Sequence, residues 1–447
     1  MEILLHICNL LGTILAVLYA YRVIFMIVGI FRTRQYAPAV KNHRYAIVIA
    51  ARNEAAVIGK LLESIKAQDY PEELLTTFVI ADNCTDTTAT EARKYGAVCY
   101  ERKDTEHCTK GYALEFLFEQ IERDYGIRYF EGYFVFDADN LLTRDFISRM
   151  NDAFDSGERV VVSYRNTKNL GDGWLSASYA LHWLRTCRLE HCGRSALGIS
   201  ARIQGTGFLF ANEFVSDGWH YTSLTEDRAF SSDVVTRGVR IAYQHAAQFY
   251  DEQPTSLLIA LRQRLRWAKG NLQAFTETCG ALLKGIFQKG GATQKCSSYD
   301  MLLFNFPYSA VSVPIKLAKA VLTVLVAVIG GLYGWSYLRL TWDVFQILIF
   351  EHLSCIALGF LVFFLERARL PRLSAGQYLL YSLTFPLFGM IGDIVSVVSI
   401  FAKVRWKPIP HHADIDIQQL ELGISKPKEK TKEKTPQKNS QAHYIER

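Results

Sequence analysis

The apolar residues of the chain gather in long uncharged runs near its two ends. The first run extends from Ile3 to Tyr21 and, after Arg22, on to Phe31, which is long enough for one tilted membrane-spanning helix. Basic residues follow it directly, and such residues normally stay on the cytoplasmic side of a membrane. We therefore expect an N-terminal membrane helix over residues 1–35, with the N-terminus outside.

A second membrane region of about three spans is predicted over 300–405. Its candidate spans are 315–338, 344–365 and 377–401. Three full crossings after the N-terminal helix would leave the Lys-rich tail outside the cell. This conflicts with the rule that basic segments stay on the cytoplasmic side. Because Pro386 and Asp393 interrupt the last segment, a re-entrant or interfacial course is the alternative for it. The polar composition of the tail, 412–447, predicts disorder.

Between the membrane regions, over 40–295, short β-rich runs alternate with helical patterns. The predicted strands are 45–51, 77–81, 98–101, 133–137 and 160–164. The predicted helices between them are 55–68, 85–95, 110–125 and 144–154. This order predicts an α/β domain with a mostly parallel sheet, whose ligands bind at the carboxyl ends of the strands.

Those carboxyl ends carry acidic side chains. The first strand runs into Asn53 and Glu54, the second into Asp82, and the fourth into Asp137 and Asp139. The sequence has no Gly-x-Gly-x-x-Gly after the first strand and no Walker loop, which argues against dinucleotide and P-loop sites. An Asp-x-Asp at the end of a buried strand can hold Mg²⁺ or Mn²⁺ together with a diphosphate, although the same pattern is typical of a turn or a helix cap.

Two further motifs follow in the chain. Thr-Glu-Asp at 225–227 opens a predicted helix, where acids also serve as simple capping residues. Gln263, Arg266 and Trp267 lie on a predicted helix after Pro254, where an amphipathic surface helix is the alternative. With these motifs in this order, the sequence resembles the family 2 glycosyltransferases of GT-A fold. It is most similar to their membrane-embedded branch of cellulose, chitin, hyaluronan and poly-N-acetylglucosamine synthases.

The resemblance implies a GT-A domain, inserted between membrane helices, that binds a nucleotide-diphosphate sugar and a divalent metal, Mg²⁺ or Mn²⁺. By similarity Asp139 is the metal ligand, and Asp137 binds the donor or supports the metal. The other donor-binding residues that the resemblance implies are Asn53, Glu54, Asp82 and Lys110. A metal and basic side chains fit this chemistry because the diphosphate leaving group needs its charge neutralised.

The resemblance makes Asp227 the general base, which takes the proton of the acceptor hydroxyl in a direct, inverting displacement. The residues that it implies on the acceptor and diphosphate side are Glu226, Gln263, Arg266, Trp267, Gly205, Thr206 and Gly207. For the loop 205–207, an ordinary strand turn is the alternative. Direct displacement needs no second carboxylate for a covalent intermediate, which distinguishes this site from that of a retaining hydrolase.

The function implied by the resemblance is that of a processive hexosyltransferase, which polymerises a β-linked polysaccharide from a UDP-sugar and moves the product across the membrane. The alternative within the family is a non-processive enzyme that adds a single sugar to a lipid or lipid-linked acceptor. A transporter or scaffold with an inactive transferase domain is disfavoured, because the acids at Asp82, Asp139 and Asp227 are intact.

The expected location is the plasma membrane, as a multi-pass protein with its catalytic domain in the cytoplasm. The expected partners are a UDP-sugar donor, a glycan acceptor and the lipid bilayer, and a separate export or regulatory subunit stays open. The formal charge of +6 is concentrated in the tail, so nucleic acid is not an expected partner. His411 and His412 are expected to bind nothing, although 405–411 resembles a Trp-containing segment that follows the last membrane element in relatives, which favours a cytosolic tail.

Overall fold

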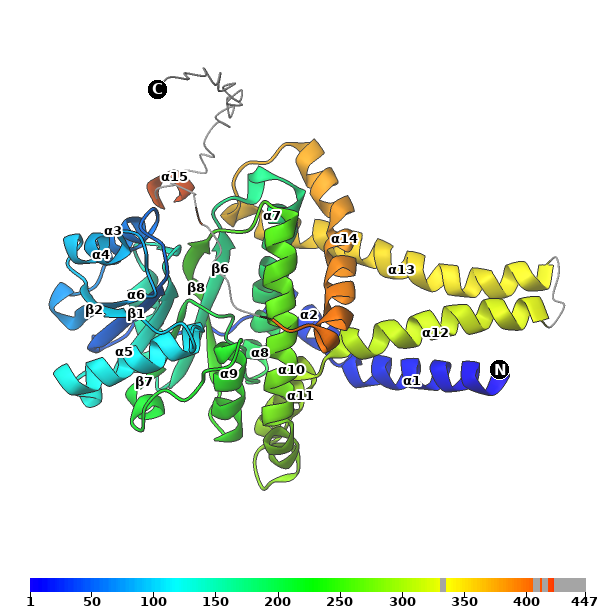
Figure 1. Ribbon diagram of the computed structural model, residues 1–447, viewed down its shortest axis with the longest axis horizontal. Coiled ribbons are helices and arrows are strands. Elements are labelled where there is room, and N and C mark those ends of the chain that lie inside the picture. Colours follow the sequence, from blue (N-terminus) through cyan, green and yellow to red (C-terminus); the bar gives the residue numbers. More distant parts are fainter. Residues whose placement is uncertain (330–334, 405–410, 412–416, 422–447) are drawn as a thin grey trace, which may run out of the picture.

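A mixed eight-stranded sheet forms the centre of the α/β domain in the computed structural model, which describes residues 1–329, 335–404, 411 and 417–421 (Figure 1). The strand order in the sheet is β3-β2-β1-β4-β7-β6-β8-β5. The strands are β1 (Tyr45–Ala51), β2 (Leu75–Asp82), β3 (Val98–Arg102), β4 (Gly132–Asp137), β5 (Leu141–Leu142), β6 (Val160–Thr167), β7 (Phe208–Ala211) and β8 (Ile241–Asp251).

All the strands predicted from the sequence are confirmed, as β1 to β4 and β6. The first four strands in the sheet order pair in parallel, as expected, and β8 runs parallel to β6. The pattern of apolar residues missed β5, β7 and β8, two of which run antiparallel to their neighbours. β7 has only four residues, and β8 carries Gln244, His245 and Gln248, which break the apolar run of a buried strand.

The predicted helices of this domain are also confirmed, as α3 (Ile58–Lys66), α4 (Thr88–Lys94), α5 (Lys110–Asp124) and α6 (Phe146–Asp155). The second half of the domain adds α7 (Trp174–Arg185), α8 (Cys192–Ala196), α9 (Glu226–Thr236), α10 (Leu257–Phe287) and α11 (Ala292–Asn305). A π-helical turn, Thr186–His191, joins α7 to α8. The apolar side chains of β1 and β4 are almost completely buried, so the core lies under the central strands.

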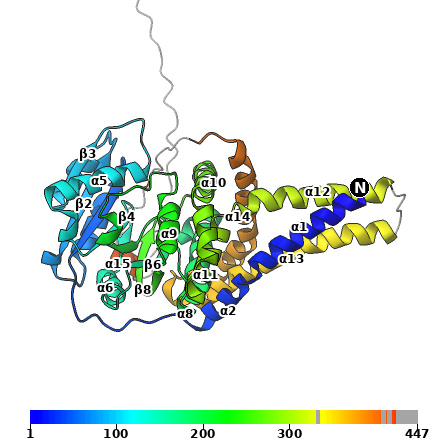
Figure 2. The same ribbon diagram turned by 90° about the horizontal axis from the view of Figure 1, so that it is seen from below.

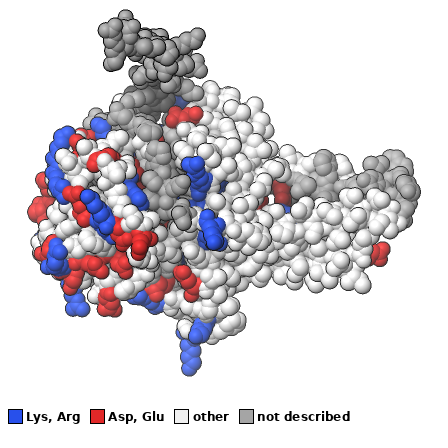
Figure 3. Space-filling model, viewed as in Figure 1, with Lys and Arg blue, Asp and Glu red and all other residues white. Residues whose placement is uncertain are grey.

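The apolar ends of the chain form an arm that projects from the α/β domain. Its helices α1 (Glu2–Ala20), α12 (Tyr308–Ile329) and α13 (Trp335–Glu366) lie side by side in two perpendicular views, and α2 (Arg22–Phe31) joins α1 to the domain (Figures 1 and 2). Charged side chains cover the domain but are nearly absent from the visible face of the arm (Figure 3). Four helices of the described residues are long and apolar enough to cross a membrane.

The fourth of these helices, α14 (Ala375–Phe401), is continuous through Pro386 and Asp393. The expectation that these two residues interrupt the last apolar segment is therefore wrong. α14 runs crosswise to the arm and packs against α7 and α10 (Figure 1). The side chain of Arg264 on α10 donates to the Phe388 carbonyl at 2.6 Å, which ties α14 to α10.

Both ends of α14 lie next to the α/β domain. Before it, the side-chain amide of Asn166 donates to the Arg369 carbonyl at 3.0 Å, and the Tyr381 hydroxyl of its second turn donates to the Gly171 carbonyl at 3.2 Å. After it, His411 contacts Glu54 of the domain. The predicted disorder of the tail falls outside the described residues, except for the short helix α15 (Ile417–Glu421).

The N-terminal apolar segment packs closely against the backbone of the α/β domain at two glycines. A methyl group added to Gly193 in α8 would lie 2.0 Å from the carbonyl oxygen of Phe25 in α2. On the facing helix, a methyl group added to Gly29 would lie 2.2 Å from the carbonyl oxygen of Leu189. Two reciprocal contacts of this kind fix how closely α2 approaches the π-helical turn and α8.

We expect Gly193→Ala to lower the melting temperature of the purified protein, because the clash is with backbone atoms that cannot rotate away. Overpacking of this kind costs about 1–3 kcal/mol. The matched control is Gly280→Ala in α10, where nothing lies within 4 Å of the added methyl group. Alanine there should be neutral or stabilising, by up to about 1 kcal/mol. Equal melting temperatures for the two variants would contradict the close packing of α2.

Candidate active site

A cavity of about 370 Å³ lies at the carboxyl ends of β1, β2 and β4, with α7, α9 and α10 on its other sides. Most of the predicted site residues line it together, although the sequence spreads them over more than 200 positions. These are Glu54, Asp82, Lys110, Asp137, Asp139, Gly205, Glu226, Asp227, Gln263, Arg266 and Trp267. Asn53, Thr206 and Gly207 do not line the cavity.

Lys110, the first residue of α5, connects the carboxylates of this cavity. Its ammonium group pairs with Asp137, donates to the Gly205 carbonyl at 2.8 Å and lies 3.9 Å from the Glu226 carboxylate. Burial alone would lower the pKa of Lys110, but the carboxylates of Asp137 and Glu226 outweigh it and raise the pKa. The side chain is therefore a fixed positive charge in the cavity.

Asp139 is buried and keeps a negative charge. Burial favours its neutral form, but His411, Lys168 and a backbone N–H hold its pKa below the ordinary value. That N–H belongs to Glu252 and donates to Oδ2 at 2.8 Å, and the amide of Asn140 donates to Oδ1 at 3.2 Å. A charged, hard oxygen donor at this position fits a divalent cation such as Mg²⁺ or Mn²⁺.

Within the described residues, no three His, Cys, Asp or Glu side chains form a ready-made metal site. A cation held by Asp139 would therefore complete its coordination shell with diphosphate oxygens and water. This is the usual arrangement for Mg²⁺, which binds through one or two carboxylates plus substrate phosphates.

The loop 205–207 supports the Asp-x-Asp turn from behind. The Thr206 hydroxyl accepts the backbone N–H of Asp137 at 2.9 Å and contacts the side chain of Asn140. Gly207 has a φ of 67°, and a methyl group on it would lie 2.2 Å from the ring of Phe249. Of this loop, Gly205 alone lines the cavity in the described part of the chain.

Asn53 and Asp82 hold the neighbouring strand ends in shape. Asn53 has a φ of 59°, and its side-chain oxygen accepts the backbone N–H of Thr85 at 2.8 Å, which ties the turn after β1 to the loop after β2. Asp82 accepts from the guanidinium of Arg102 on β3 at 2.8 Å. Asp82 lines the cavity, whereas Asn53 lies outside it.

Asp227 and Glu226 occupy the first turn of α9. Burial raises the pKa of Asp227 above the ordinary aspartate value, against the opposing charges of Arg228 and Lys110. Burial likewise raises the pKa of Glu226 to about 7, against the charge of Lys110. A half-buried carboxylate with a raised pKa at the edge of a cavity has the properties of a general base.

Three residues of α10 form the opposite wall. Trp267 packs edge-on against Trp183 and Tyr179, with ring centroids 5.7 and 6.0 Å away. The guanidinium of Arg266 lies 3.5 Å from the Leu224 carbonyl, just before α9, and Gln263 lies one turn earlier on the helix. The predicted pattern therefore presents an aromatic surface and a cation to one cavity. Trp183, which the sequence pattern did not single out, belongs to the same surface.

His411 is a site residue that the sequence interpretation missed. Its Nδ1 lies 3.0 Å from both carboxylate oxygens of Glu54, and its side chain lines the cavity. Burial would lower its pKa, but the carboxylates of Asp139 and Glu54 raise it to about 10. The expectation that His411 binds nothing is therefore wrong. The rest of the Trp-containing segment, 405–410, lies outside the described residues.

The sequence interpretation also missed a cluster of arginines at the Phe304 end of the cavity. The guanidinium carbons of Arg202 and Arg228 lie 3.9 Å from the centroid of the Phe304 ring, at the end of α11. Arg22 lines the same end of the cavity, although it comes from the apolar N-terminal segment. The sequence did carry a signal here, because a single Arg or Lys in an apolar run usually faces a functional interior.

Comparison with known proteins identifies a family for this arrangement. The sequence profile described as "Glycosyltransferase like family 2" matches residues 43–270, about half of the chain. The probable glycosyltransferase YdaM of Bacillus subtilis is 23% identical over 289 residues, which cover 59% of this chain and 62% of the relative. A β-monoglucosyldiacylglycerol synthase of Nostoc sp. is 26% identical over 271 residues, covering 58% of this chain and 54% of the relative.

The chain thus matches between half and two thirds of the length of these curated relatives. Among solved structures, the mannosyltransferase PcManGT from Pyrobaculum calidifontis, in complex with GDP-mannose and Mn²⁺, superposes with a TM-score of 0.58 at 15% identity. The superposition covers 90% of this chain and 98% of PcManGT. The predicted GT-A fold, with apolar helices flanking the α/β domain, is confirmed.

We expect His411→Gln to release the chain that follows α14 from the α/β domain, because the variant loses the charge that Glu54 and Asp139 attract. Limited trypsin digestion should then cut at Lys403 several times faster than in the unaltered protein. His220→Gln, at an exposed histidine outside the cavity, is the matched control and should leave the cleavage rate unchanged. If both variants are cut at the rate of the unaltered protein, the contact does not hold this segment.

Proposed function

Because the chain belongs to glycosyltransferase family 2, we propose that it transfers one sugar from a nucleotide-diphosphate sugar, with inversion, to a lipid acceptor held in the membrane. The observation that carries this proposal is the composition of the cavity. Donor-side acids and the base Asp227 share one cavity with Arg22, a residue of the N-terminal membrane helix. An acceptor hydroxyl at a membrane surface can thus reach the base without leaving the bilayer.

The similarity to a β-monoglucosyldiacylglycerol synthase, whose name describes a glycolipid product, supports a lipid acceptor. So does the end of the cavity at Phe304, where α11 leads into the arm helix α12. The amphipathic α10 and the crosswise α14 lie between the α/β domain and the arm, at the level expected for the membrane surface (Figures 1 and 2).

The reaction follows from the charges in the cavity. Asp227 takes the proton of the acceptor hydroxyl while the acceptor oxygen forms its bond to the anomeric carbon. The bond between that carbon and the β-phosphate oxygen breaks on the opposite side, and the nucleoside diphosphate leaves. Lys110 and Arg266 stabilise the negative charge that develops on the leaving diphosphate. The rings of Trp267 and Trp183 offer a flat apolar surface on which a sugar ring can stack.

Asp139, with Asp137 nearby, would hold a divalent cation, Mg²⁺ or Mn²⁺. A bound cation would neutralise charge on the diphosphate. The complex of PcManGT with GDP-mannose and Mn²⁺ supports a metal of this kind. We take UDP as the nucleotide, on the resemblance described above.

A second candidate is processive synthesis of a β-linked polysaccharide. The observation that favours it is the position of Gln263, Arg266 and Trp267 together on the cavity wall, since this pattern resembles that of the polysaccharide synthases. The product then has many sugars instead of one, and its length distinguishes the two candidates.

We further propose that the α/β domain faces the cytoplasm of a multi-pass membrane protein. The segments α1–α2, α12 and α13 would cross the bilayer, and α14 would lie at its surface. The N-terminus then faces outward, and the basic residues after α2 and α13 stay inside with the tail. In this assignment the basic residues next to the membrane helices all lie on the cytoplasmic side.

We expect Asp227→Asn to abolish sugar transfer while leaving nucleoside diphosphate binding nearly unchanged, since the amide keeps the size of the side chain but accepts no proton. Loss of a general base commonly costs about 10²–10⁴-fold in rate. Asp217→Asn, at an exposed aspartate outside the cavity, is the matched control. Turnover of Asp227→Asn within a few fold of this control would exclude Asp227 as the base.

The pH dependence of kcat/KM, which reports the ionisation of the free enzyme, offers a separate test of the same base. Asp227 works only when ionised, and burial raises its pKa, so activity should fall as the pH drops through that raised value. The midpoint of the acidic limb should therefore lie above about 4, the ordinary pKa of an aspartate. A flat profile down to this pH would contradict a buried carboxylate base.

We expect membranes that contain the protein to convert a radiolabelled UDP-sugar into a product that extracts into organic solvent and carries a single sugar. Mass spectrometry of the extract gives the number of sugars per lipid. The matched control is membranes with Asp227→Asn. A water-soluble product of many sugars, digested by a glycosidase, would reject the lipid acceptor and support the polysaccharide synthase.

A further inference from the structure

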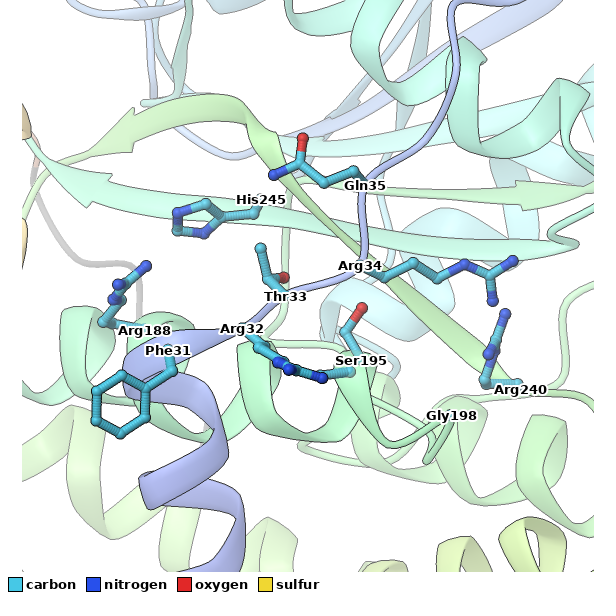
Figure 4. A pocket seen from close by; sticks show the side chains of 11 residues that line it. Phe31, Arg32, Thr33, Arg34, Gln35, Arg188, Ser195, Gly198, Arg240 and His245 are labelled. Carbon is cyan, nitrogen blue, oxygen red and sulfur yellow. The ribbon is translucent and has the colours of Figure 1, made fainter.

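A second cavity, separate from the active site, opens where the N-terminal membrane helix enters the α/β domain. It has a volume of about 590 Å³ and begins at Phe31, the last residue of α2, whose side chain is 79% exposed. Four arginines line it, as Figure 4 shows: Arg32, Arg34, Arg188 and Arg240. The described residues that line this cavity include no Asp or Glu.

The carboxylates behind this cavity do not balance its arginines. Arg34 and Arg240 share the single carboxylate of Glu158, with Arg34 at 3.2 Å. Arg188 lies 3.4 Å from the carboxylate of Glu366. Arg32 has no side-chain partner in the part of the chain that the structure describes. Four arginines against two carboxylates leave an excess of two positive charges.

The cavity lies where two membrane helices meet the domain. Arg188, in the π-helical turn, donates to the carbonyl of Ile30 near the end of α2 at 2.9 Å, and it pairs with Glu366 at the end of α13. These helices belong to the apolar segments Glu2–Phe31 and Ile349–Arg369, each of which is long and apolar enough to span a bilayer and ends here. The arginines therefore stand at the depth where lipid headgroups replace the hydrocarbon core.

The other polar groups of the cavity are neutral. Ser195 and Thr33 contribute hydroxyls between the guanidinium groups (Figure 4). Burial, together with Arg369 and Arg188, lowers the pKa of His245 to about 3, so this ring stays uncharged. Guanidinium groups bind phosphate oxygens with paired hydrogen bonds, and hydroxyls bind them as neutral donors. A lining of guanidinium and hydroxyl groups therefore suits a phosphate group.

We propose that this cavity binds the phosphate of an anionic phospholipid headgroup at the cytoplasmic side of the membrane. The acyl chains of that lipid extend along α2 and α13, where Phe31 already faces outward. The bound phosphate neutralises the excess charge and holds 32–35 against the π-helical turn. The same turn supplies Thr186 and Glu190 to the active-site cavity, so the lipid stabilises the element that connects the two sites. This proposal does not depend on the nature of the acceptor.

The test is a thermal melt of the full-length protein in detergent micelles, titrated with dioctanoylphosphatidylglycerol. Dioctanoylphosphatidylcholine serves as the zwitterionic lipid, and soluble glycerol phosphate as the headgroup without chains. The variants are Arg32→Gln, Arg32→Lys and, as the matched control, Arg128→Gln, at an exposed arginine that does not line this cavity. Because Arg32 is exposed and lacks a side-chain partner among the described residues, its substitution should leave the fold intact.

We expect phosphatidylglycerol, and not phosphatidylcholine, to raise the melting temperature of the unaltered protein and of Arg128→Gln. Arg32→Gln should weaken the apparent affinity about fivefold, which corresponds to about 1 kcal/mol for one arginine near an anionic surface. Arg32→Lys should recover most of that loss. The same titration curve for Arg32→Gln and Arg128→Gln, or equal effects of the two lipids, would overturn the proposal. Stabilisation by glycerol phosphate as strong as that by phosphatidylglycerol would assign the cavity to a soluble phosphate and overturn the lipid as its source.

Discussion

A buried ionic network joins the N-terminal apolar helices to the wall of the catalytic cavity, and the positions of α2, α11 and the π-helical turn depend on it. The guanidinium of Arg194, fully buried, binds Asp300 of α11 at 2.8 and 3.2 Å and Glu190 of the π-helical turn at 3.1 Å. The Tyr21 hydroxyl, at the junction of α1 and α2, donates to Asp300 at 2.6 Å. Burial would raise the pKa of Asp300, but Arg194 and Arg202 lower it to about 2, so the network stays charged. Removing one partner from such a network typically costs about 3–5 kcal/mol, because a buried charge is left unpaired.

The network connects the candidate active site to the apolar helices of the arm. It fixes the π-helical turn, whose residue Glu190 lines the active-site cavity while Arg188 lines the arginine cavity at the membrane surface. It also fixes α2, so that Arg22 enters the catalytic cavity instead of facing lipid. The donor half of the site depends on a different element, the parallel strand ends that hold Asp82, Asp137 and Asp139. The two halves meet at Asp227, where α9 begins beside Arg228.

The sequence predicted the donor half well, because each residue there follows a buried strand in a continuous local pattern. The apolar runs that end at Asp82 and Asp137 identify both the strands and the edge of the sheet where the strands end.

The sequence predicted the residues at the other end of the cavity less well. His411 reaches Glu54 only after the chain has passed through α14 and returned to the domain, and no local pattern encodes such a contact. The sequence also left open that Arg22 lines the cavity, since an apolar run does not reveal which of its faces meets protein. The short β7 and the polar-containing β8 were missed for a similar reason, because their burial comes from neighbours distant in sequence.

We propose that a membrane lipid reaches the catalytic cavity at its Phe304 end. Photo-crosslinking tests it most directly, with benzoylphenylalanine in place of Phe304 and irradiation of the protein in native membranes. Benzoylphenylalanine in place of Val17, which is 69% exposed on the arm, is the positive control. Benzoylphenylalanine in place of Tyr129, on the α/β domain, is the negative control. We expect a lipid adduct at 304, reduced by added acceptor lipid, together with an adduct at 17 and none at 129. A lipid adduct at 17 without one at 304 would contradict the claim that the cavity receives its acceptor from the membrane.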